Sequence, residues 1–404
     1  MKIVHVEDCF LPTSGYQLNF LAKWNVIHGH EVTVIASDSL APWTNVGFCT
    51  EQLEEMDRDY ESKFGVKILR VHSYRRISGR EFIGKKLFEI VDAEKPDIVM
   101  VHGFDTLTGL RFIWKLGKLK YPMISDCHMY PVASKNHFAK LFKSYVKTFI
   151  TPRIEKYRLK IAAISTATKH FMINSYSIPE YLIPIIPFGT DTDLFKPDKE
   201  QHKIARKNLG IPENSFVIVY TGKITKDKKV VLLAKAFKQH IQQNHEKASY
   251  LIMVGSGSGE YYDNVVKTLA PVKAHVRFVP TQKVWNLPQY YQAADIAVWP
   301  GACSLSFFDA QACGLPVIAE NIAGNDERLS YNNGWLFESD NVEDLCKKIE
   351  HAATLSSAEL AEIGERGRHK VMETQSYDKI ARDFEELMRS EIKRFEFEIN
   401  RRLQ

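Results

Sequence analysis

The stretch Phe216-Val-Ile-Val-Tyr220, followed by Thr221-Gly-Lys-Ile-Thr-Lys-Asp-Lys-Lys229, decides the fold class of this chain. An uninterrupted apolar run of this length predicts a strand buried on both faces, as in a parallel sheet. The apolar residues from Val230 to Phe237 have helical spacing, so the glycine and lysines occupy a strand-to-helix turn. Such a turn concentrates backbone N–H groups, helix dipole and ammonium charge, which favours a diphosphate ligand. A lysine-rich turn is also typical of a solvated loop.

Short apolar strands alternate with amphipathic helices on both sides of this segment, which predicts mostly parallel sheets covered by helices. A chain of 404 residues is too long for one ordinary core. The segment from Ile186 to Pro197 is rich in Pro, Gly and Asp. We therefore predict an α/β protein with Rossmann-like domains at 1–187 and 200–379 and a linker at 188–199. Strands are expected at 3–6, 31–36, 66–71, 97–102, 122–125, 161–165, 216–220, 250–254, 276–279, 295–299 and 316–319.

Composition excludes several classes of protein. Hydrophobic residues make up 45% of the chain, and its apolar runs are shorter than the roughly 18 residues that span a bilayer. The six cysteines lie far apart without a CxxC pair, which fits reduced thiols in a cytoplasm rather than a disulfide framework or zinc site. Residues 1–190 hold 25 Lys and Arg against 19 Asp and Glu, whereas residues 191–404 hold 29 against 30. The basic surplus therefore belongs to the first half.

A second stretch, Pro300-Gly-Ala-Cys-Ser-Leu-Ser-Phe-Phe-Asp309, follows another predicted strand. Its small residues allow backbone amides to approach a ligand. A helix that starts near Leu305 would direct its N-terminal amides toward that ligand, with Asp309 about one turn inside on a ligand-accessible face. A carboxylate there can accept hydrogen bonds from two ribose hydroxyls. The alternative is that Asp309 is an ordinary first-turn helix acid.

Here the chain resembles the retaining, nucleotide-sugar-dependent glycosyltransferases of family 4. The most specific likeness is Asp309-Ala-Gln-Ala-Cys-Gly-Leu-Pro-Val-Ile-Ala319 to the family's Glu-Ala-Met-Ala-Cys-Gly-x-Pro-Val segment. Further likenesses are Pro12-Thr-Ser-Gly-Tyr16, Gly29-His-Glu-Val-Thr-Val34, Pro96-Asp-Ile-Val99, Ile186-Pro-Phe-Gly-Thr-Asp191 and Tyr291-Gln-Ala-Ala-Asp295. The resemblance implies a GT-B fold, in which two Rossmann-like domains face each other across a cleft and a C-terminal helix, here 380–404, returns to the first domain.

The resemblance also implies roles for single residues. Lys223 and Lys228 would hold the donor diphosphate, Asp309 would bind ribose, and His128 would lie near the reacting sugar. His102 and Asp126 are weaker candidates at the same edge of the cleft, because polar residues at strand ends often only satisfy loop amides. The remaining residues implied in donor binding are Gly15, Tyr16, Gly222, Gly255, Gln282, Ser304, Leu305 and Ser306.

Two positions depart from the family pattern. The first acid of the family's E-x7-E motif, which contacts the transferred sugar, falls on Gly301. The usual double glycine of the first loop is Gly15-Tyr16, which adds a bulky phenol. The identity of the sugar is therefore open.

The resemblance implies a mechanism without a cofactor or metal. Lysines and amides would stabilise charge on the departing diphosphate, which would itself accept the acceptor's proton. No Asp-x-Asp pair stands before an apolar strand in the way a Mn²⁺ or Mg²⁺ site would require; Asp191-Thr-Asp193 has the spacing but lies in the linker.

The segment 135–160 predicts a surface for the acceptor. It holds eight Lys or Arg and one acid, Glu155, and its apolar residues at 138, 141, 142, 145, 146 and 149 have helical spacing. This pattern is typical of a helix on an anionic membrane, or of an amphipathic domain helix with a solvated basic face. Nucleic acid is not expected, because no nucleic-acid module accompanies the charge. We expect a cytoplasmic protein, peripheral on the inner membrane face, with a glycan or lipid-linked acceptor from envelope polysaccharide or glycolipid synthesis.

Two other functions remain open from the sequence. A nucleotide-sugar epimerase would need acids and histidines grouped for acid-base work. A non-catalytic, nucleotide-binding partner subunit would be compatible with the glycine at position 301.

Overall fold

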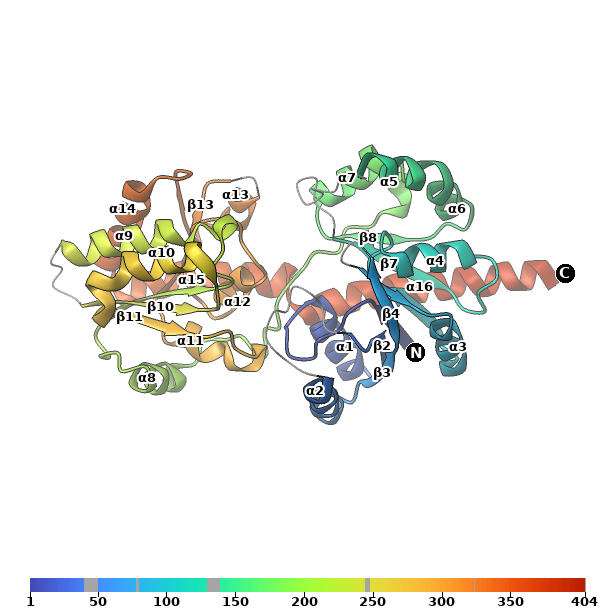
Figure 1. The fold of residues 1–404 in the computed structure, drawn as a ribbon, viewed down its shortest axis with the longest axis horizontal. Coiled ribbons are helices and arrows are strands. Elements are labelled where there is room, and N and C mark those ends of the chain that lie inside the picture. Colours follow the sequence, from blue (N-terminus) through green and yellow to red (C-terminus); the bar gives the residue numbers. More distant parts are fainter. Residues whose placement is uncertain (40–49, 78–79, 129–138, 244–247, 323, 404) are drawn as a thin grey trace. The chain divides into compact units, whose positions relative to one another are not determined.

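The computed structural model describes residues 1–39, 50–77, 80–128, 139–243, 248–322 and 324–403. The chain divides into two compact units (Figure 1). Unit 1 comprises Met1–Phe188 and Asp378–Gln404, and unit 2 comprises Gly189–Tyr377. The first division falls at the start of the segment 188–199 that was expected to be the linker.

Unit 1 contains a parallel six-stranded sheet with the order β3-β2-β1-β6-β7-β8. All six strands lie where they were predicted, because apolar runs such as Ile98–Val101 fill positions that are covered on both faces. The antiparallel hairpin β4–β5 was missed, since its first strand, Ser-Tyr-Arg-Arg-Ile, is not apolar. The elements are β1 (Lys2–Glu7), α1 (Gln17–Ile27), β2 (Glu31–Ser37), α2 (Thr50–Phe64), β3 (Lys67–Val71), β4 (Ser73–Ile77), β5 (Arg80–Ile83), α3 (Lys86–Glu94), β6 (Ile98–Val101), α4 (Leu107–Lys115), β7 (Met123–Cys127), α5 (Ala139–Tyr145), α6 (Thr151–Lys156), β8 (Ile161–Ala163), α7 (Thr166–Tyr176) and α16 (Tyr377–Leu403).

The two faces of this sheet differ in chemistry. Val4 and Val6 of β1 belong to an apolar cluster with residues of α3, α4, α6 and α7. Side chains alternate along a strand, so His5 points to the opposite face, where it contacts Asn25 of α1. One face is therefore a conventional apolar core, while the other buries polar groups.

Unit 2 repeats the topology with the order β11-β10-β9-β12-β13-β14. Five of its strands were predicted, and β14 was not, because Gly-Trp-Leu-Phe is short and begins with glycine. The elements are α8 (Lys199–Asn208), β9 (Phe216–Thr221), α9 (Val230–Gln242), β10 (Ser249–Val254), α10 (Gly259–Leu269), β11 (Val276–Val279), α11 (Pro288–Gln292), β12 (Ile296–Trp299), α12 (Ser306–Ala312), β13 (Val317–Glu320), α13 (Asn325–Arg328), β14 (Gly334–Phe337), α14 (Val342–Thr354) and α15 (Ser357–Thr374).

The two chain crossings between the units are tied together at Thr190. Its N–H donates to the Gln375 carbonyl at 2.9 Å, and its carbonyl accepts from Tyr377 N–H at 3.0 Å. Both partners lie in unit 2. This pairing fixes the end of unit 2 from which α16 departs.

Candidate functional site

The turn after β9 holds the lysines that were predicted to bind a diphosphate. Gly222 has a φ of +144°, which favours glycine, and a 3₁₀ turn over Lys226–Lys228 leads into α9. Lys223 is exposed, whereas Lys228 is partly buried and its Nζ donates to the Ala302 carbonyl at 2.8 Å. Burial lowers the pKa of Lys228, and Asp227 opposes this effect. The predicted strand, turn and helix are confirmed.

Lys229, the last lysine of the quoted stretch, has a structural contact. Its Nζ lies 2.5 Å from the buried Glu320 carboxylate and 2.8 Å from Asp340. Since this ammonium is engaged by two acids, it is a poorer candidate for phosphate than Lys228.

A second glycine turn touches the first. A Cβ on Gly255 would lie 1.9 Å from the Gly222 carbonyl oxygen, so only glycine permits this approach. Ile224 N–H also donates to the Ser256 carbonyl at 3.0 Å. The loops after β9 and β10 therefore meet at the carboxyl edge of the sheet, as the parallel order requires.

The loop that contains Gln282 is held to the same place. Thr281 N–H donates to Ser256 Oγ at 3.1 Å. Gln282 is partly exposed and its Nε2 donates to the Pro280 carbonyl at 3.0 Å. This bond would have to open before the Nε2 amide could donate to a nucleotide sugar.

The loop after β12 explains the glycine at position 301. A Cβ there would lie 2.8 Å from both the Asp227 carbonyl oxygen and the Lys228 carbonyl carbon. The neighbouring Ala302 N–H donates to the same Asp227 oxygen at 3.3 Å. With the loops in this conformation no side chain, and hence no carboxylate, fits at position 301. The contact between the two loops that leaves no room for a glutamate at position 301 also brings Lys228 next to the loop after β12.

Ser304, Leu305 and Ser306 lie at the start of α12. The two serine hydroxyls are hydrogen bonded to each other, and Ser306 Oγ donates to the Thr221 carbonyl at 3.3 Å. The helix begins at Ser306, close to the predicted start. The next two amides already donate to the carbonyls of Ser304 and Leu305, at 3.1 and 2.9 Å. The helix start therefore has fewer amides to offer a ligand than predicted.

The expectation that Asp309 lies on a ligand-accessible face is wrong for this conformation. The residue is only 7% exposed, and its Oδ1 accepts from Thr190 Oγ at 2.6 Å. Burial raises the pKa of Asp309 to about 7, with Asp191 adding to the rise and the Thr190 bond opposing it. The cause is a contact across 119 residues of sequence. Ribose binding by Asp309 would need the Thr190 bond to open.

In unit 1, the carboxyl ends of β6 and β7 bring His128 together with both weaker candidates. Asp126 Oδ2 lies 2.9 Å from His102 Nδ1 and 3.2 Å from His128 Nε2. Asp126 Oδ1 accepts from Gly103 N–H at 2.7 Å. Burial would raise the pKa of Asp126, but the two imidazoles hold it well below its usual range. His128 is 39% exposed, and although burial acts to lower its pKa, the Asp126 carboxylate raises it.

Glu7, at the end of β1, belongs to the same edge and was missed as a candidate. Burial raises the pKa of Glu7 to about 7, and the charges of His102 and His128 act against this rise. The available signal was an acid directly after an apolar strand. That is the same signal that selected His102.

The glycine loop of unit 1 is organised by Asn19, which sequence reasoning also missed. Gly15 has a φ of +70°, and Tyr16 is 50% exposed at the start of α1. Asn19 Oδ1 accepts from Ser14 Oγ at 2.8 Å and from Tyr16 N–H at 2.9 Å. The Tyr16 phenol is thus presented at the surface of unit 1, as a side chain available for contact.

The basic segment forms two short helices, α5 and α6, joined by a π-helical turn over Val146–Ile150. Its first residues, 135–138, lie outside the described residues. The predicted single apolar stripe is wrong, because Phe142, Tyr145 and Val146 pack against the core while Leu141 and Phe149 are 68% and 54% exposed. Two outward apolar side chains remain among exposed lysines.

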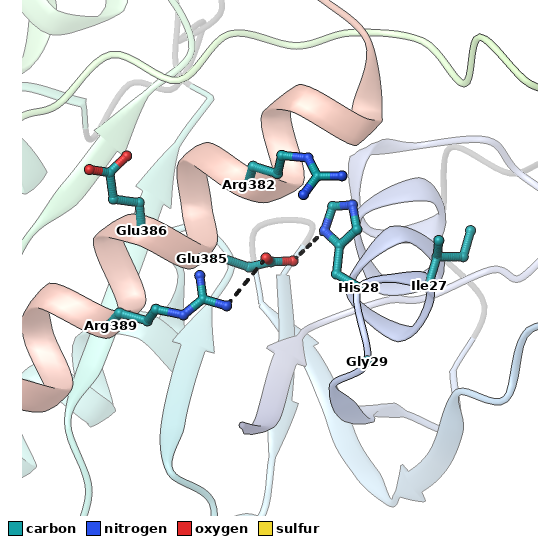
Figure 2. Close-up of a pocket in the computed structure, with 7 residues that line it drawn as sticks. All are labelled: Ile27, His28, Gly29, Arg382, Glu385, Glu386 and Arg389. Carbon is teal, nitrogen blue, oxygen red and sulfur yellow. Dashed lines mark hydrogen bonds and ion pairs between the residues drawn. The ribbon is translucent and has the colours of Figure 1, made fainter.

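A pocket of about 690 Å³ in unit 1 lies between the end of α1 and helix α16 rather than at the carboxyl ends of the strands (Figure 2). Within the described ranges, no group of His, Cys, Asp and Glu has the geometry of a metal site, and no helix is long and apolar enough to cross a bilayer. The pocket is lined by Ile27, His28, Gly29, Arg382, Glu385, Glu386 and Arg389.

Comparison with solved structures bears on the fold. A glycosyltransferase from Rickettsia africae superposes with a TM-score of 0.74 at 21% identity, covering 97% of this chain and 98% of that one. Anabaena HepE, in complex with UDP and glucose, superposes with a TM-score of 0.71 at 16% identity, covering 96% and 100%. The GT-B fold class predicted above is confirmed.

Sequence comparison bears on the family. D-inositol 3-phosphate glycosyltransferase of Corynebacterium aurimucosum is 26% identical over 259 residues, which are 59% of this chain and 61% of that protein. UDP-Gal:alpha-D-GlcNAc-diphosphoundecaprenol alpha-1,3-galactosyltransferase of Escherichia coli is 25% identical over 265 residues, 64% of this chain and 66% of that protein. The chain thus covers somewhat less than two thirds of these curated relatives. Residues 19–194 match the family model Glycosyltransferase Family 4 and residues 201–370 match Glycosyl transferases group 1. The chain belongs to this family of glycosyltransferases.

Proposed function

We propose that the chain is a retaining glycosyltransferase that moves a sugar from a UDP- or GDP-sugar to a glycan or lipid-linked acceptor, without a metal. The observation that carries the proposal is the meeting of three loops at the carboxyl edge of the unit 2 sheet. Glycines at 255 and 301 let the backbones of these loops touch, and Lys228 Nζ donates to the Ala302 carbonyl of the third loop at 2.8 Å. A diphosphate is the ligand that matches amides and ammonium groups in this arrangement.

The reaction follows from where charge develops. As the bond between the anomeric carbon and the diphosphate oxygen breaks, negative charge grows on the leaving group. Lys228 and Lys223 would stabilise that charge, and a fixed cation in a partly dry site is worth more than in water. The acceptor hydroxyl oxygen forms the new bond to the anomeric carbon on the same face. Its proton passes to the departing diphosphate, so no carboxylate nucleophile is required.

His128 would contact the transferred sugar from unit 1. Asp126 keeps the imidazole oriented through the 3.2 Å contact to Nε2, which leaves Nδ1 for a sugar hydroxyl. The Asp126 carboxylate raises the pKa of His128, which favours the imidazolium form and its N–H donors. A histidine held in this way can stabilise charge but is not needed as a base.

Donor and acceptor classes are suggested by relatives and by the surface of unit 1. The Escherichia coli relative is named for UDP-Gal and a diphosphoundecaprenol acceptor, and a HepE structure contains UDP-glucose. Both favour a UDP-sugar here. The exposed Leu141 and Phe149 among lysines favour acceptor binding at an anionic membrane surface, as used in envelope polysaccharide synthesis.

Thermal unfolding with a panel of nucleoside diphosphates, then with sugars of the best base, tests the proposal. We expect stabilisation by UDP or GDP and slow hydrolysis of one nucleotide sugar. Nucleotide binding without hydrolysis or transfer would favour a non-catalytic partner subunit. Conversion of the monosaccharide without an acceptor would favour an epimerase. Lack of stabilisation by any nucleotide would refute the proposed site.

A further inference from the structure

The His128 cluster continues inward as a chain of buried hydrogen bonds. His102, which contacts Asp126 through Nδ1, has its Nε2 3.1 Å from Nδ1 of His5. His5 is fully buried, and its Nε2 lies 3.2 Å from Asn25 Oδ1. The two imidazole planes differ by 26°, which suits a bond between ring edges. The mechanism above uses none of the inner residues.

The chain ends on α16. Asn25 Nδ2 donates to Glu385 Oε1 at 2.9 Å, and His28 Nδ1 lies 2.7 Å from the same oxygen. Figure 2 shows Glu385 reaching from α16 toward His28. The Glu385 side chain is only 3% exposed. A buried carboxylate with several donors is a well-fixed end point.

This chain of hydrogen bonds from Asp126 through His102, His5 and Asn25 to Glu385, called the relay below, runs from the carboxyl end of the sheet to its amino end. Asp126 and His102 lie at the carboxyl ends of their strands, whereas His28 precedes β2, at the amino end of the same parallel sheet. The relay therefore connects the candidate sugar-binding edge to the helix that begins where the chain leaves unit 2.

The hydrogen-bonding capacities fix where the protons lie. Both ends are carboxylates, which only accept, so Asn25 gives its N–H to Glu385 and its oxygen to His5. His5 then donates through Nε2, and His102 donates to Asp126 through Nδ1. The remaining His5–His102 contact holds one proton, so the two rings share one positive charge. Burial and His102 lower the pKa of His5 to about 3, which places that charge on His102.

We propose that His5, His102 and Asn25 are positioning residues. They link Glu385 on α16 to Asp126, fix the positive charge next to Asp126, and thereby control the protonation of His128. The role of this arrangement in sugar transfer rests on the proposed function. The arrangement of charges does not depend on it, because it follows from contacts within unit 1. His128 faces Asp126 on β7, Glu7 on β1, Asp105 after β6 and, across Asp126, His102.

The substitution His5→Phe tests the relay because it keeps a ring and removes the acceptor for His102 Nε2. A charged His102 would then bury an N–H without a partner, so His102 becomes neutral and keeps only its bond to Asp126. Asp126 loses one of its two cations and holds the His128 proton more tightly. We expect the pKa of His128, measured by imidazole NMR on the full chain, to rise by about one unit.

The matched control is His240→Phe in unit 2, where a fully buried histidine bonds Ser249 at 2.8 Å. It should cost comparable stability and leave the His128 titration unchanged. If His5→Phe does not fold, the unmodified chain decides by its ¹⁵N shifts at neutral pH. His102 should be protonated on both nitrogens and His5 on Nε2 alone.

Two results would overturn the relay: an unchanged His128 titration in His5→Phe, or a wild-type chain with neutral His102 and protonated His5. If the chain transfers sugar, kcat of His5→Phe should fall about tenfold with little change in donor KM. Failure to find any transfer would count against the proposed function only, since the NMR readout needs no substrate.

Discussion

The carboxyl edges of the two sheets share a topology and differ in what they present. In each unit the first strand lies between the second and fourth, so the same loops meet at the same place. In unit 1 the edge carries charged side chains, with His102, His128 and Asp126 in contact. In unit 2 it carries backbone, brought together by glycines, and one partly buried ammonium at Lys228.

The difference teaches how one architecture supports two kinds of recognition. Under the proposed function, a diphosphate would be bound by many weak donors on closely approaching loops, which glycine permits. A reacting sugar would need a few oriented groups, which Asp126 would provide by orienting His128. We therefore expect changes in unit 2 to affect nucleotide affinity as well as turnover, and changes in unit 1 to affect turnover with little effect on nucleotide affinity.

The largest effect is expected from Lys228→Ala, which removes the ammonium from the unit 2 edge. The leaving group would lose a fixed cation, so kcat/KM should fall about 100- to 1,000-fold. Steady-state kinetics on the preferred nucleotide sugar measure this. Lys226→Ala, an exposed lysine of the same turn, is the control and should change little. Equal losses in both would mean that the turn acts only through net charge.

Gly301→Ala should separate the loop after β12 from the backbone of Asp227 and Lys228, which now leaves room only for glycine at this position. Its methyl would meet the Asp227 and Lys228 backbone at 2.8 Å, so the loops must separate, at a cost of about 1–3 kcal/mol. Chemical denaturation and nucleotide titration should both show the loss. Ala302→Ser adds one atom at the exposed neighbouring position and should be nearly silent. Normal stability and binding in Gly301→Ala would show that the loop moves freely.

Sequence reasoning was most successful where physics is local. Runs such as Phe216–Tyr220 predicted strands because both faces of a parallel sheet are covered, so no alternation is needed. The turn that holds Gly222 and Lys228 was predicted for the same reason, since strand, turn and helix follow one another along the chain. Strand β4 of the β4–β5 hairpin was not predicted because its sequence is not apolar, and β14 was not predicted because it is short and begins with glycine.

Sequence reasoning failed where distant residues decide. Asp309 is hydrogen bonded to Thr190, and the space at Gly301 is limited by the backbone of Asp227. Neither partner is near in sequence. The His5 relay was invisible for the same reason, although a histidine inside an apolar strand was a signal. The π-helical turn over Val146–Ile150 changes the helical spacing after Tyr145, which accounts for Phe149 leaving the predicted stripe.

Asp309→Asn sharpens the comparison within unit 2 through pH. The folded pKa of Asp309, about 7, exceeds its ordinary 3.8, so the protonated carboxyl stabilises the fold fully at low pH. That contribution is lost as pH rises through 7. The amide of the variant keeps the neutral shape, so the variant should gain about 2 kcal/mol over wild type at pH 8 and nothing near pH 4. Denaturation at both pH values measures it, with the exposed Asp263→Asn as control. A gain that does not depend on pH would contradict a buried neutral Asp309.

The smallest effect is expected at the outer surface of unit 1. Leu141→Glu with Phe149→Glu places acids among the lysines of α5 and the π-helical turn. Binding to anionic vesicles in a sedimentation assay should fall several-fold, while stability and soluble nucleotide binding stay unchanged. Thr148→Glu, an exposed polar position, controls for added charge. If vesicle binding is unchanged in the double variant, Leu141 and Phe149 do not contact the membrane.

Calorimetric titration of UDP and GDP into the wild-type chain and Lys228→Ala tests the central claim most directly. We predict that at least one of the two nucleotides binds wild type at a single site and loses at least tenfold in affinity in Lys228→Ala, with Lys226→Ala unchanged. Equal affinity in all three proteins, or no binding of either nucleotide to the wild type, would contradict the assignment of the unit 2 edge to the donor diphosphate.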